Sequence, residues 1–180
     1  MKNHSFNSRL SKLVYTAVFA AISIALNTLE INLVSFKVTF TYIPIFLSGA
    51  FLGPLAGLLT GAIGDVVGFL IYPTGSLYNP FFTISSALIG VFAGVVFKYT
   101  TFKEPFKIWI GYFLVFIVCT LAINTTTIYY LYFATKKAFA AYLISRVSTQ
   151  GAVIIFNMIL TYSVLAPLKN ILRFKKFSRA

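Results

Sequence analysis

Apolar residues fill the chain in long blocks, and short polar or glycine- and proline-containing segments separate these blocks. Runs of about 20 apolar residues are typical of helices that span a membrane, whereas membrane β-strands alternate apolar and polar positions. The apolar runs here are continuous rather than alternating. The pattern therefore predicts an all-α integral membrane protein with six transmembrane helices, over residues 13–29, 38–53, 55–72, 81–98, 108–130 and 143–165.

The second and third predicted helices form one apolar stretch that Gly53 and Pro54 interrupt. Proline removes a backbone donor and restricts the residue before it, so this pair favours a tight turn. Each of the two segments is short against the about 20 residues that a full span needs. Two interpretations stay open, a helical hairpin shielded by the other helices and a single kinked helix.

Composition supports a membrane protein, since 59% of the 180 residues are hydrophobic and only 10% are charged. Soluble proteins carry about 25% charged residues. No helix-sized segment is left over for a soluble module, so a single domain over residues 1–180 is expected. The net charge of +12 comes mainly from Lys and Arg at predicted helix ends, which favours membrane anchoring over nucleic-acid binding.

Lys and Arg are distributed unequally between the two faces of the predicted bundle. Six spans place eleven of them on the face of the two termini and four, Lys37, Lys136, Lys137 and Arg146, on the other face. Because loops rich in positive charge stay in the cytoplasm, both termini are predicted to be cytoplasmic. The outer cations suit an anionic solute that arrives from outside, and interfacial anchoring is the alternative.

Asp65 is the acidic residue with the strongest functional implication, since Glu30 and Glu104 fall in predicted loops. It lies within a predicted helix and is flanked by glycines. A carboxylate at membrane depth needs a cation, a ligand rich in hydrogen-bond donors or a wet cavity. Two roles stay open for it, contact with a ligand and a structural ion pair with Arg146.

Other polar and aromatic residues gather in two regions of the sequence. The predicted outer segment 72–85 combines prolines, aromatic rings and hydroxyl groups, which is typical of an ordered loop that contacts a ligand or of an interfacial aromatic belt. In the sixth predicted helix Arg146, Gln150 and Asn157 share a face that is expected to point into the bundle, as ligand contacts or as an internal network. The candidate ligand contacts are Lys37, Asp65, Tyr78, Asn79, Phe82, Thr83, Ser85, Asn124, Arg146 and Gln150.

Ala17, Ala21 and Ala25 recur every four residues along the first predicted helix and so line one of its faces. Stripes of small residues allow helices to pack closely in membranes. The partner of this face is either another helix of the same chain or a separate protein.

The chain lacks the sequence signatures of several catalytic sites. It contains no Walker lysine motif, no catalytic triad and no cluster of His, Cys and carboxylate residues that would hold a metal. No cofactor is expected, and the chain is not predicted to be an enzyme.

Spaced motifs over most of the chain resemble a known family. The first motif resembles the second helix and turn of substrate-binding (S) components of energy-coupling factor (ECF) transporters. It reads Phe36-x-Val38-x-Phe40-x-x-x-Pro44-x-x-x-x-Gly49-x-x-x-Gly53-Pro54-x-x-Gly57. The alanine stripe is similar to the motif with which this family docks on its coupling subunit. Two further motifs resemble the folate-specific branch of the family, namely Gly64-Asp65-x-x-Gly68-x-x-x-x-Pro73-x-Gly75 and Pro80-x-Phe82-Thr83-x-Ser85-x-x-x-x-Gly90. The chain departs from that branch at Asn79, where the branch more often has Phe.

The resemblance implies a subunit of the bacterial cytoplasmic membrane that binds folate or a reduced folate at high affinity from outside. It also implies association with two ATPases and a transmembrane coupling subunit, docked at the alanine stripe, and toppling of the subunit in the bilayer. Folate offers a pterin ring with adjacent N–H donors, which Asp65 can accept, and an anionic tail for the outer cations. The alternatives are an S component for riboflavin or another flat vitamin, and a membrane scaffold that transports nothing.

Overall fold

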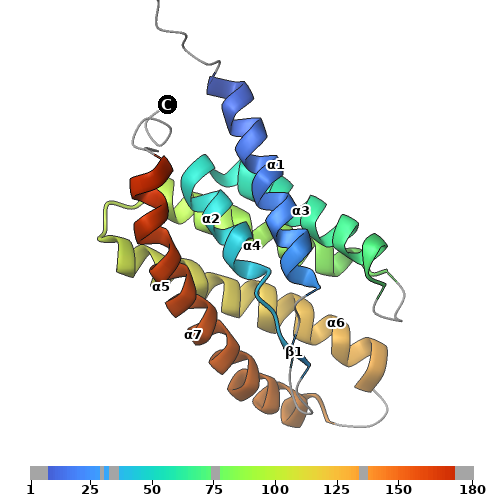
Figure 1. Cartoon of the computed structure of the whole chain (residues 1–180). Helices are drawn as coiled ribbons and strands as arrows, with labels where there is room; N and C mark the ends of the chain where they lie inside the picture. Colours follow the sequence, from blue (N-terminus) through green and yellow to red (C-terminus); the bar gives the residue numbers. More distant parts are fainter. Residues whose placement is uncertain (1–7, 29–30, 33–36, 74–77, 134–137, 173–180) are drawn as a thin grey trace, which may run out of the picture.

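The structure is a computed structural model that describes residues 8–28, 31–32, 37–73, 78–133 and 138–172. Two short strands, β1 (Ile31–Asn32) and β2 (Lys37–Val38), pair antiparallel between the first two helices. Nearly all other described residues are helical (Figure 1). The helices are α1 (Ser8–Asn27), α2 (Tyr42–Leu52), α3 (Pro54–Ile71), α4 (Pro80–Tyr99), a continuous rod of α5 (Glu104–Leu114), π-helical η1 (Val115–Thr125), α6 (Thr126–Ile128) and π-helical η2 (Tyr129–Phe133), and α7 (Phe139–Leu172).

Five of the described helices are long and apolar enough to cross a membrane, and α2 is a shorter apolar helix. Each of the six predicted spans coincides with one of these helices. The prediction is wrong at the start of the second span, because β2 and a turn occupy residues 37–41 before α2 begins. That stretch contains Val and Thr, and a short apolar run of this kind does not separate strand from helix by its periodicity.

The second and third predicted spans form a hairpin, so the single kinked helix is excluded. α2 ends at Leu52, Gly53 adopts a φ of 102°, and Pro54 opens α3. The positive φ is accessible to glycine without a steric penalty, and proline is well suited to the first turn of a helix. A hydrogen bond of 2.7 Å between the buried hydroxyls of Ser48 and Thr60 joins the two arms.

Glycines allow α4 to pack directly against the α2–α3 hairpin. A Cβ atom built on Gly57 would lie 2.5 Å from the carbonyl oxygen of Gly90, and one built on Gly90 would lie 2.2 Å from the Gly57 backbone. No side chain fits into such a contact, so the two backbones touch. The bulky part of the core, which includes Phe46, Ile89 and Tyr112, packs beside this crossing.

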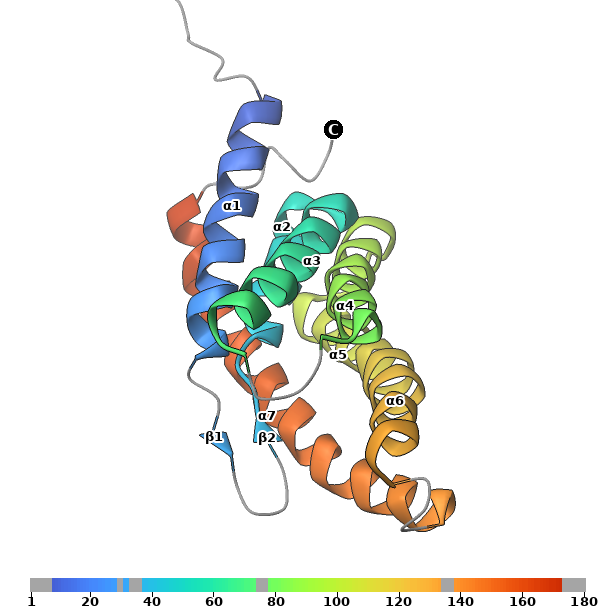
Figure 2. The ribbon, with the colours of Figure 1, turned by 90° about the vertical axis from the view of Figure 1, so that its right-hand side faces the viewer.

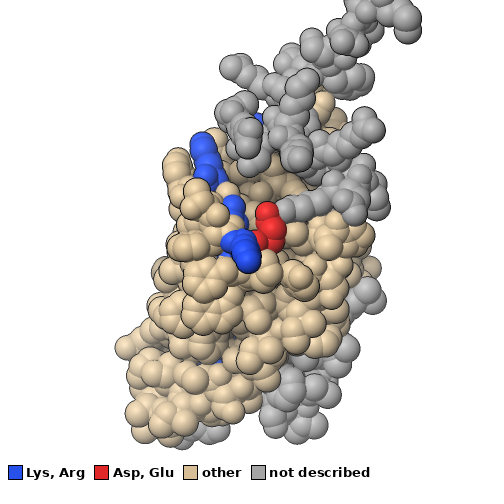
Figure 3. Space-filling model, turned by 90° about the vertical axis from the view of Figure 1, so that its left-hand side faces the viewer, with Lys and Arg blue, Asp and Glu red and all other residues tan. Residues whose placement is uncertain are grey.

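The first turn of α1 and the last turn of α7 lie at the same end of the bundle (Figure 1). The two strands and the first turns of α7 lie toward the opposite end (Figure 2). Charged residues flank the connection between α4 and α5, with Lys98 in the last turn of α4, Lys103 in the connection, and Glu104 and Lys107 in the first turn of α5. A space-filling view from that side shows basic side chains gathered beside an acidic group, on a face where other charged atoms are few (Figure 3). The orientation of these ends across a membrane stays a prediction.

Candidate ligand-binding site

On α7, Gln150 and Asn157 point into the bundle, as the sequence predicts, and Arg146 on the same face is half-buried. Gln150 is 8% exposed, and Asn157 and Thr161 are fully buried. The Asn157 amide donates through Nδ2 to the carbonyl oxygens of Thr39, at 3.1 Å, and Val153, at 3.0 Å. α7 therefore presents a hydrogen-bonding face to the interior, and that face reaches the segment before α2.

Residues from two other helices lie around the hydroxyl of Tyr42, at the start of α2. The side chains of Thr120 and Asn124 in η1 lie within hydrogen-bonding reach of it, and the positive charge of Arg146 in α7 interacts with it electrostatically. We call Tyr42, Thr120, Asn124 and Arg146 the Tyr42 cluster. The sequence analysis identified Asn124 and Arg146 but missed Tyr42 and Thr120, because both lie in apolar runs where nothing separates them from lipid-facing or packing residues.

Several polar atoms of this region are buried and lack a hydrogen-bond partner in the described part of the chain. They are Arg146 Nε and, further along α7, Asn157 Oδ1, together with Thr120 Oγ1 and Asn124 Oδ1, whose nearest polar neighbour is the Tyr42 hydroxyl. Buried polar groups in native proteins nearly always have a partner, and an unsatisfied one costs about 1–3 kcal/mol. A polar ligand held between α2, η1 and α7 can supply the missing partners.

The helix that faces α7 is π-helical where it carries Thr120 and Asn124. Within it the hydroxyl of Thr125 donates to the carbonyl oxygen of Thr120, five residues earlier, at 2.7 Å. π-helical segments occur frequently at functional sites. The sequence contained no signal for η1, because a continuous apolar run has no period that separates a π-helix from an α-helix.

Asp65 lies at the interface of α3 and α4, where hydroxyl groups of α4 donate to both of its carboxylate oxygens. Thr83 Oγ1 donates to Oδ2 at 2.6 Å, and Ser86 Oγ donates to Oδ1 at 3.3 Å. The Tyr78 hydroxyl shares a further hydrogen bond of 2.6 Å with Thr83. Ser86 was not predicted, although its spacing of three residues from Thr83 places both on one helix face.

The ion pair considered for Asp65 is not formed within the described ranges. Asp65 is occupied by α4, whereas the Arg146 guanidinium lies over the Tyr142 ring, with Cζ 5.9 Å from the ring centroid. The two charged residues therefore belong to separate polar centres, one between α3 and α4 and the other in the Tyr42 cluster.

The remaining predicted contacts lie around these two centres. Asn79 accepts from the backbone N–H two residues later, at 3.0 Å, and so caps α4. Ser85 is buried and donates to the carbonyl oxygen of Cys119 in η1, at 3.3 Å, which links α4 to the helix of the Tyr42 cluster. Phe82 is half-buried. Lys37 belongs to β2, and its side chain lies outside the described part of the structure.

The alanine stripe of α1 faces away from the bundle. Ala17, Ala21 and Ala25 are exposed, whereas Phe19 is 6% exposed and Ser23 is fully buried on the inward face. Packing of the stripe against another described helix of this chain is therefore excluded. The stripe remains available to a separate protein or to lipid.

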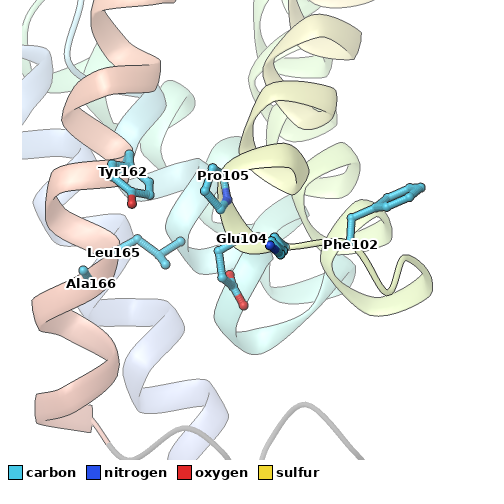
Figure 4. Close-up of a pocket in the computed structure, with 7 residues that line it drawn as sticks. Phe102, Glu104, Pro105, Tyr162, Leu165 and Ala166 are labelled. Atoms are coloured by element: carbon cyan, nitrogen blue, oxygen red, sulfur yellow. The ribbon is translucent and has the colours of Figure 1, made fainter.

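A cavity of about 450 Å³ lies between the start of α5 and the later turns of α7, with Glu104 directed toward it (Figure 4). Tyr162 in its wall lies about 24 Å along α7 from Arg146, at 1.5 Å per residue. None of the predicted ligand contacts lines this cavity, which is formed by Phe102, Lys103, Glu104, Pro105, Tyr162, Leu165 and Ala166. Among the described residues, no three His, Cys, Asp or Glu side chains come together as a metal site.

The sequence matches the family described as ECF transporter, substrate-specific component, over residues 11–165. The folate transporter FolT of Clostridium novyi (strain NT) is 26% identical over 155 residues, which are 86% of this chain and 87% of that protein. An uncharacterized protein of Mycoplasma pneumoniae, the MG313 homolog, is 33% identical over 122 residues, which are 62% of this chain and 43% of that protein.

A crystal structure of FolT bound with folic acid has a similar fold, with a TM-score of 0.68 and 23% sequence identity over 84% of this chain and 90% of that one. The family match includes the alanine stripe, the α2–α3 hairpin and both polar centres. Together with the apolar helices, it identifies a multi-pass membrane protein. The chain belongs to the family of ECF transporter substrate-specific components.

Proposed function

We propose that this chain is the folate-binding subunit of an ECF-type importer, which captures the vitamin from outside and passes it inward. The observation that carries the proposal is the likeness to the folate transporter FolT of Clostridium novyi, which extends over 86% of this chain. The family membership and the fold shared with a FolT that holds folic acid agree with it. Folate or a reduced folate is the expected ligand.

The ligand is proposed to bind between α2, η1 and α7 and to extend toward the α3–α4 interface. Unsatisfied buried atoms in the first region and the hydroxyl-rich environment of Asp65 in the second support this placement. Flat rings stack well on aromatic side chains such as those of segment 78–82. The proposed contacts are Lys37, Asp65, Tyr78, Asn79, Phe82, Thr83, Ser85, Asn124, Arg146 and Gln150.

A transmembrane coupling subunit is proposed to dock on the alanine stripe of α1 and to connect this chain to two ATPase subunits. The exposure of Ala17, Ala21 and Ala25 supports this role, because small side chains let a partner helix approach closely. The protein is proposed to lie in the bacterial cytoplasmic membrane with both termini in the cytoplasm. The common end of α1 and α7 and the excess of basic residues on that face support this orientation.

The proposal is tested by titrating the purified chain, without ATP and without partners, with folic acid, a reduced folate and riboflavin. We expect a nanomolar Kd for a folate, which corresponds to about −12 kcal/mol, and no saturable heat with riboflavin. Isothermal titration calorimetry measures both. Binding of riboflavin without binding of any folate would show that the chain serves another flat vitamin.

A further inference from the structure

We infer that Asp65 acts on the ligand through Thr83 and Tyr78, by holding the Tyr78 hydroxyl as a hydrogen-bond acceptor for an N–H donor of the ligand. The inference rests on the proposed function. It narrows the role of Asp65 there from a ligand contact to a positioning residue. Two observations carry it, the chain of hydrogen bonds that joins the three side chains and the place of α4 between Asp65 and the Tyr42 cluster.

The chain starts at the Asp65 carboxylate, which receives a hydroxyl on each of its oxygens. Thr83 Oγ1 donates to Oδ2 at 2.6 Å, and Ser86 Oγ donates to Oδ1 at 3.3 Å. An ionised carboxylate only accepts hydrogen bonds, and a hydroxyl has a single proton to donate. The Thr83 proton is therefore committed to Asp65, and the Thr83 oxygen can only accept from any other neighbour.

The next member of the chain is Tyr78, whose hydroxyl oxygen lies 2.6 Å from Thr83 Oγ1. Because Thr83 has no second proton, Tyr78 is the donor in this hydrogen bond. The Tyr78 oxygen then has only lone pairs left for a ligand. Hydrogen bonds in series polarise one another, and the carboxylate at the end of the chain makes this oxygen a better acceptor.

Tyr78 is accessible, and its ring is held as well as its hydroxyl. The side chain is 42% exposed, and its ring centroid lies 5.4 Å from that of Phe69 in α3. The following residue, Asn79, caps α4. An acceptor that is fixed before the ligand arrives loses little side-chain entropy on binding. Tyr78 is thus preorganised to accept a hydrogen bond.

α4 separates Asp65 from the Tyr42 cluster. Ser85 on α4 donates to the Cys119 carbonyl oxygen of η1 at 3.3 Å, whereas Thr83 donates toward α3. Residues two apart on an α-helix point in directions about 200° apart. A ligand beside η1 therefore lies on the far side of α4 from Asp65, and the hydroxyls of Thr83 and Tyr78 connect the carboxylate to it.

The direction of the chain restricts the ligand group that Tyr78 can bind. A carbonyl or carboxylate oxygen placed there would meet lone pairs, whereas an N–H group would meet an acceptor. The adjacent N–H donors of a pterin ring have this chemistry. A site that is built to accept a hydrogen bond discriminates strongly against an analogue that lacks the donor.

The test measures the Kd of folic acid for variants of the purified full-length chain by calorimetry, with thermal unfolding as the check on folding. Tyr78→Phe removes the acceptor, and Thr83→Val breaks the chain at nearly constant volume. Asp65→Asn lets an amide N–H donate to Thr83, whose proton can then turn to Tyr78 and reverse the chain. The second and third variants are also combined with Tyr78→Phe.

Each single variant should weaken folic acid by about tenfold, because each removes the same fixed acceptor. Each double variant should remain about tenfold weaker rather than about a hundredfold, since its two changes act through one group. Tyr78→p-aminophenylalanine, which can donate to Thr83 but is a poor acceptor, should bind as weakly as Tyr78→Phe.

Ser86→Ala is the matched control, because it also removes a hydroxyl from the Asp65 carboxylate but lies outside the chain to Tyr78. It should lower the midpoint of thermal unfolding and leave the Kd within about twofold, as a packing contact would. Thr83→Ser keeps the linking hydroxyl and should retain the Kd of the unmodified chain.

Equal weakening by Ser86→Ala and Thr83→Val would overturn the inference, since the carboxylate would then only fasten α3 to α4. Additive losses in the double variants would overturn it too, because Asp65 would act independently of Tyr78. Full affinity with p-aminophenylalanine at position 78 would show that Tyr78 is not an acceptor. If Thr83→Val does not fold, the Asp65→Asn and Tyr78→Phe variants decide. Failure of the unmodified chain to bind any folate would instead defeat the proposed function.

Discussion

At the scale of single residues, Asp65 and Arg146 have hydrogen-bonding environments that do not overlap. Hydroxyls of α4 satisfy the carboxylate, whereas the guanidinium lies among Tyr42, Asn124 and the Tyr142 ring. The sequence identified both as functional candidates, since charges within apolar helices stand out. It left their pairing open, because the rotation of α3 and α7 about their own axes decides which neighbours they face.

A double variant tests this separation. Asp65→Asn and Arg146→Gln should each weaken folic acid binding by about ten- to hundredfold, because each removes a hydrogen bond to a charged group. The two losses should add within about 0.5 kcal/mol, since the residues share no partner. Calorimetric Kd values of the unmodified chain, both single variants and the double variant measure this sum.

Asp65→Glu is the control for that experiment, because it keeps the charge and both acceptor oxygens. It should lose less affinity than Asp65→Asn. Recovery of affinity in the double variant, relative to either single variant, would instead reveal an ion pair between the two residues.

At the scale of elements, the helices were predictable and the non-helical segment was not. Gly53 and Pro54 indicated a break between α2 and α3, because glycine can adopt a positive φ and proline removes a backbone donor. The short strands around residues 31–38 were missed, since two residues per strand are too few to show an alternating pattern. The crossing of α4 over the hairpin was also missed, because the contact between Gly57 and Gly90 joins positions far apart in the chain.

Replacement of glycine at that crossing should destabilise the protein. Gly57→Ala places a Cβ atom 2.5 Å from the Gly90 carbonyl oxygen, so the two backbones must separate. Overpacking of this kind costs about 1–3 kcal/mol, which should appear as a lower midpoint of thermal unfolding in detergent without ligand.

Gly151→Ala is the matched control, because a Cβ atom there meets nothing closer than Phe116 Cζ at 3.9 Å. Alanine is favoured over glycine within a helix by about 1 kcal/mol, so this variant should unfold at the same or a higher temperature. Equal effects of the two substitutions would show that the α3–α4 contact is not a constraint on packing.

At the scale of the whole molecule, the proposed ligand site and the proposed docking face lie on different surfaces. The Tyr42 cluster is enclosed by α2, η1 and α7, whereas the alanine stripe covers the outward face of α1. The sequence identified the alanine stripe of α1 and the polar face of α7 with Arg146 and Gln150. Each set lies within a single helix, so its residues recur with the helical period. It missed Tyr42, Thr120 and Ser86, since their places in the polar centres depend on how separate helices meet.

This separation predicts a variant that binds the vitamin but does not transport it. Ala21→Trp puts a large ring on the exposed face of α1, where it should block a close helix contact without reaching the ligand. Cellular uptake of labelled folic acid should be abolished, and the Kd of the purified variant should stay within about twofold of the unmodified chain.

Ala152→Trp controls for the bulk of the ring, because Ala152 is an exposed alanine on α7 away from the stripe. Its uptake should be retained. A parallel loss of binding and uptake in Ala21→Trp would mean that the α1 face supports the fold rather than a partner.

The late start of α2 has a consequence for how the chain is solvated. Its 11 residues extend about 16 Å, roughly half of a hydrocarbon layer of about 30 Å, so non-helical backbone must cover the rest of that depth. Such backbone needs donors from the protein, because lipid provides none. Asn157 supplies one of them, since its amide donates to the Thr39 carbonyl from across the bundle. A side chain of α7 thus satisfies a backbone carbonyl that an earlier start of α2 would have satisfied within the helix itself, so the depth at which α2 begins depends on the packing of α7.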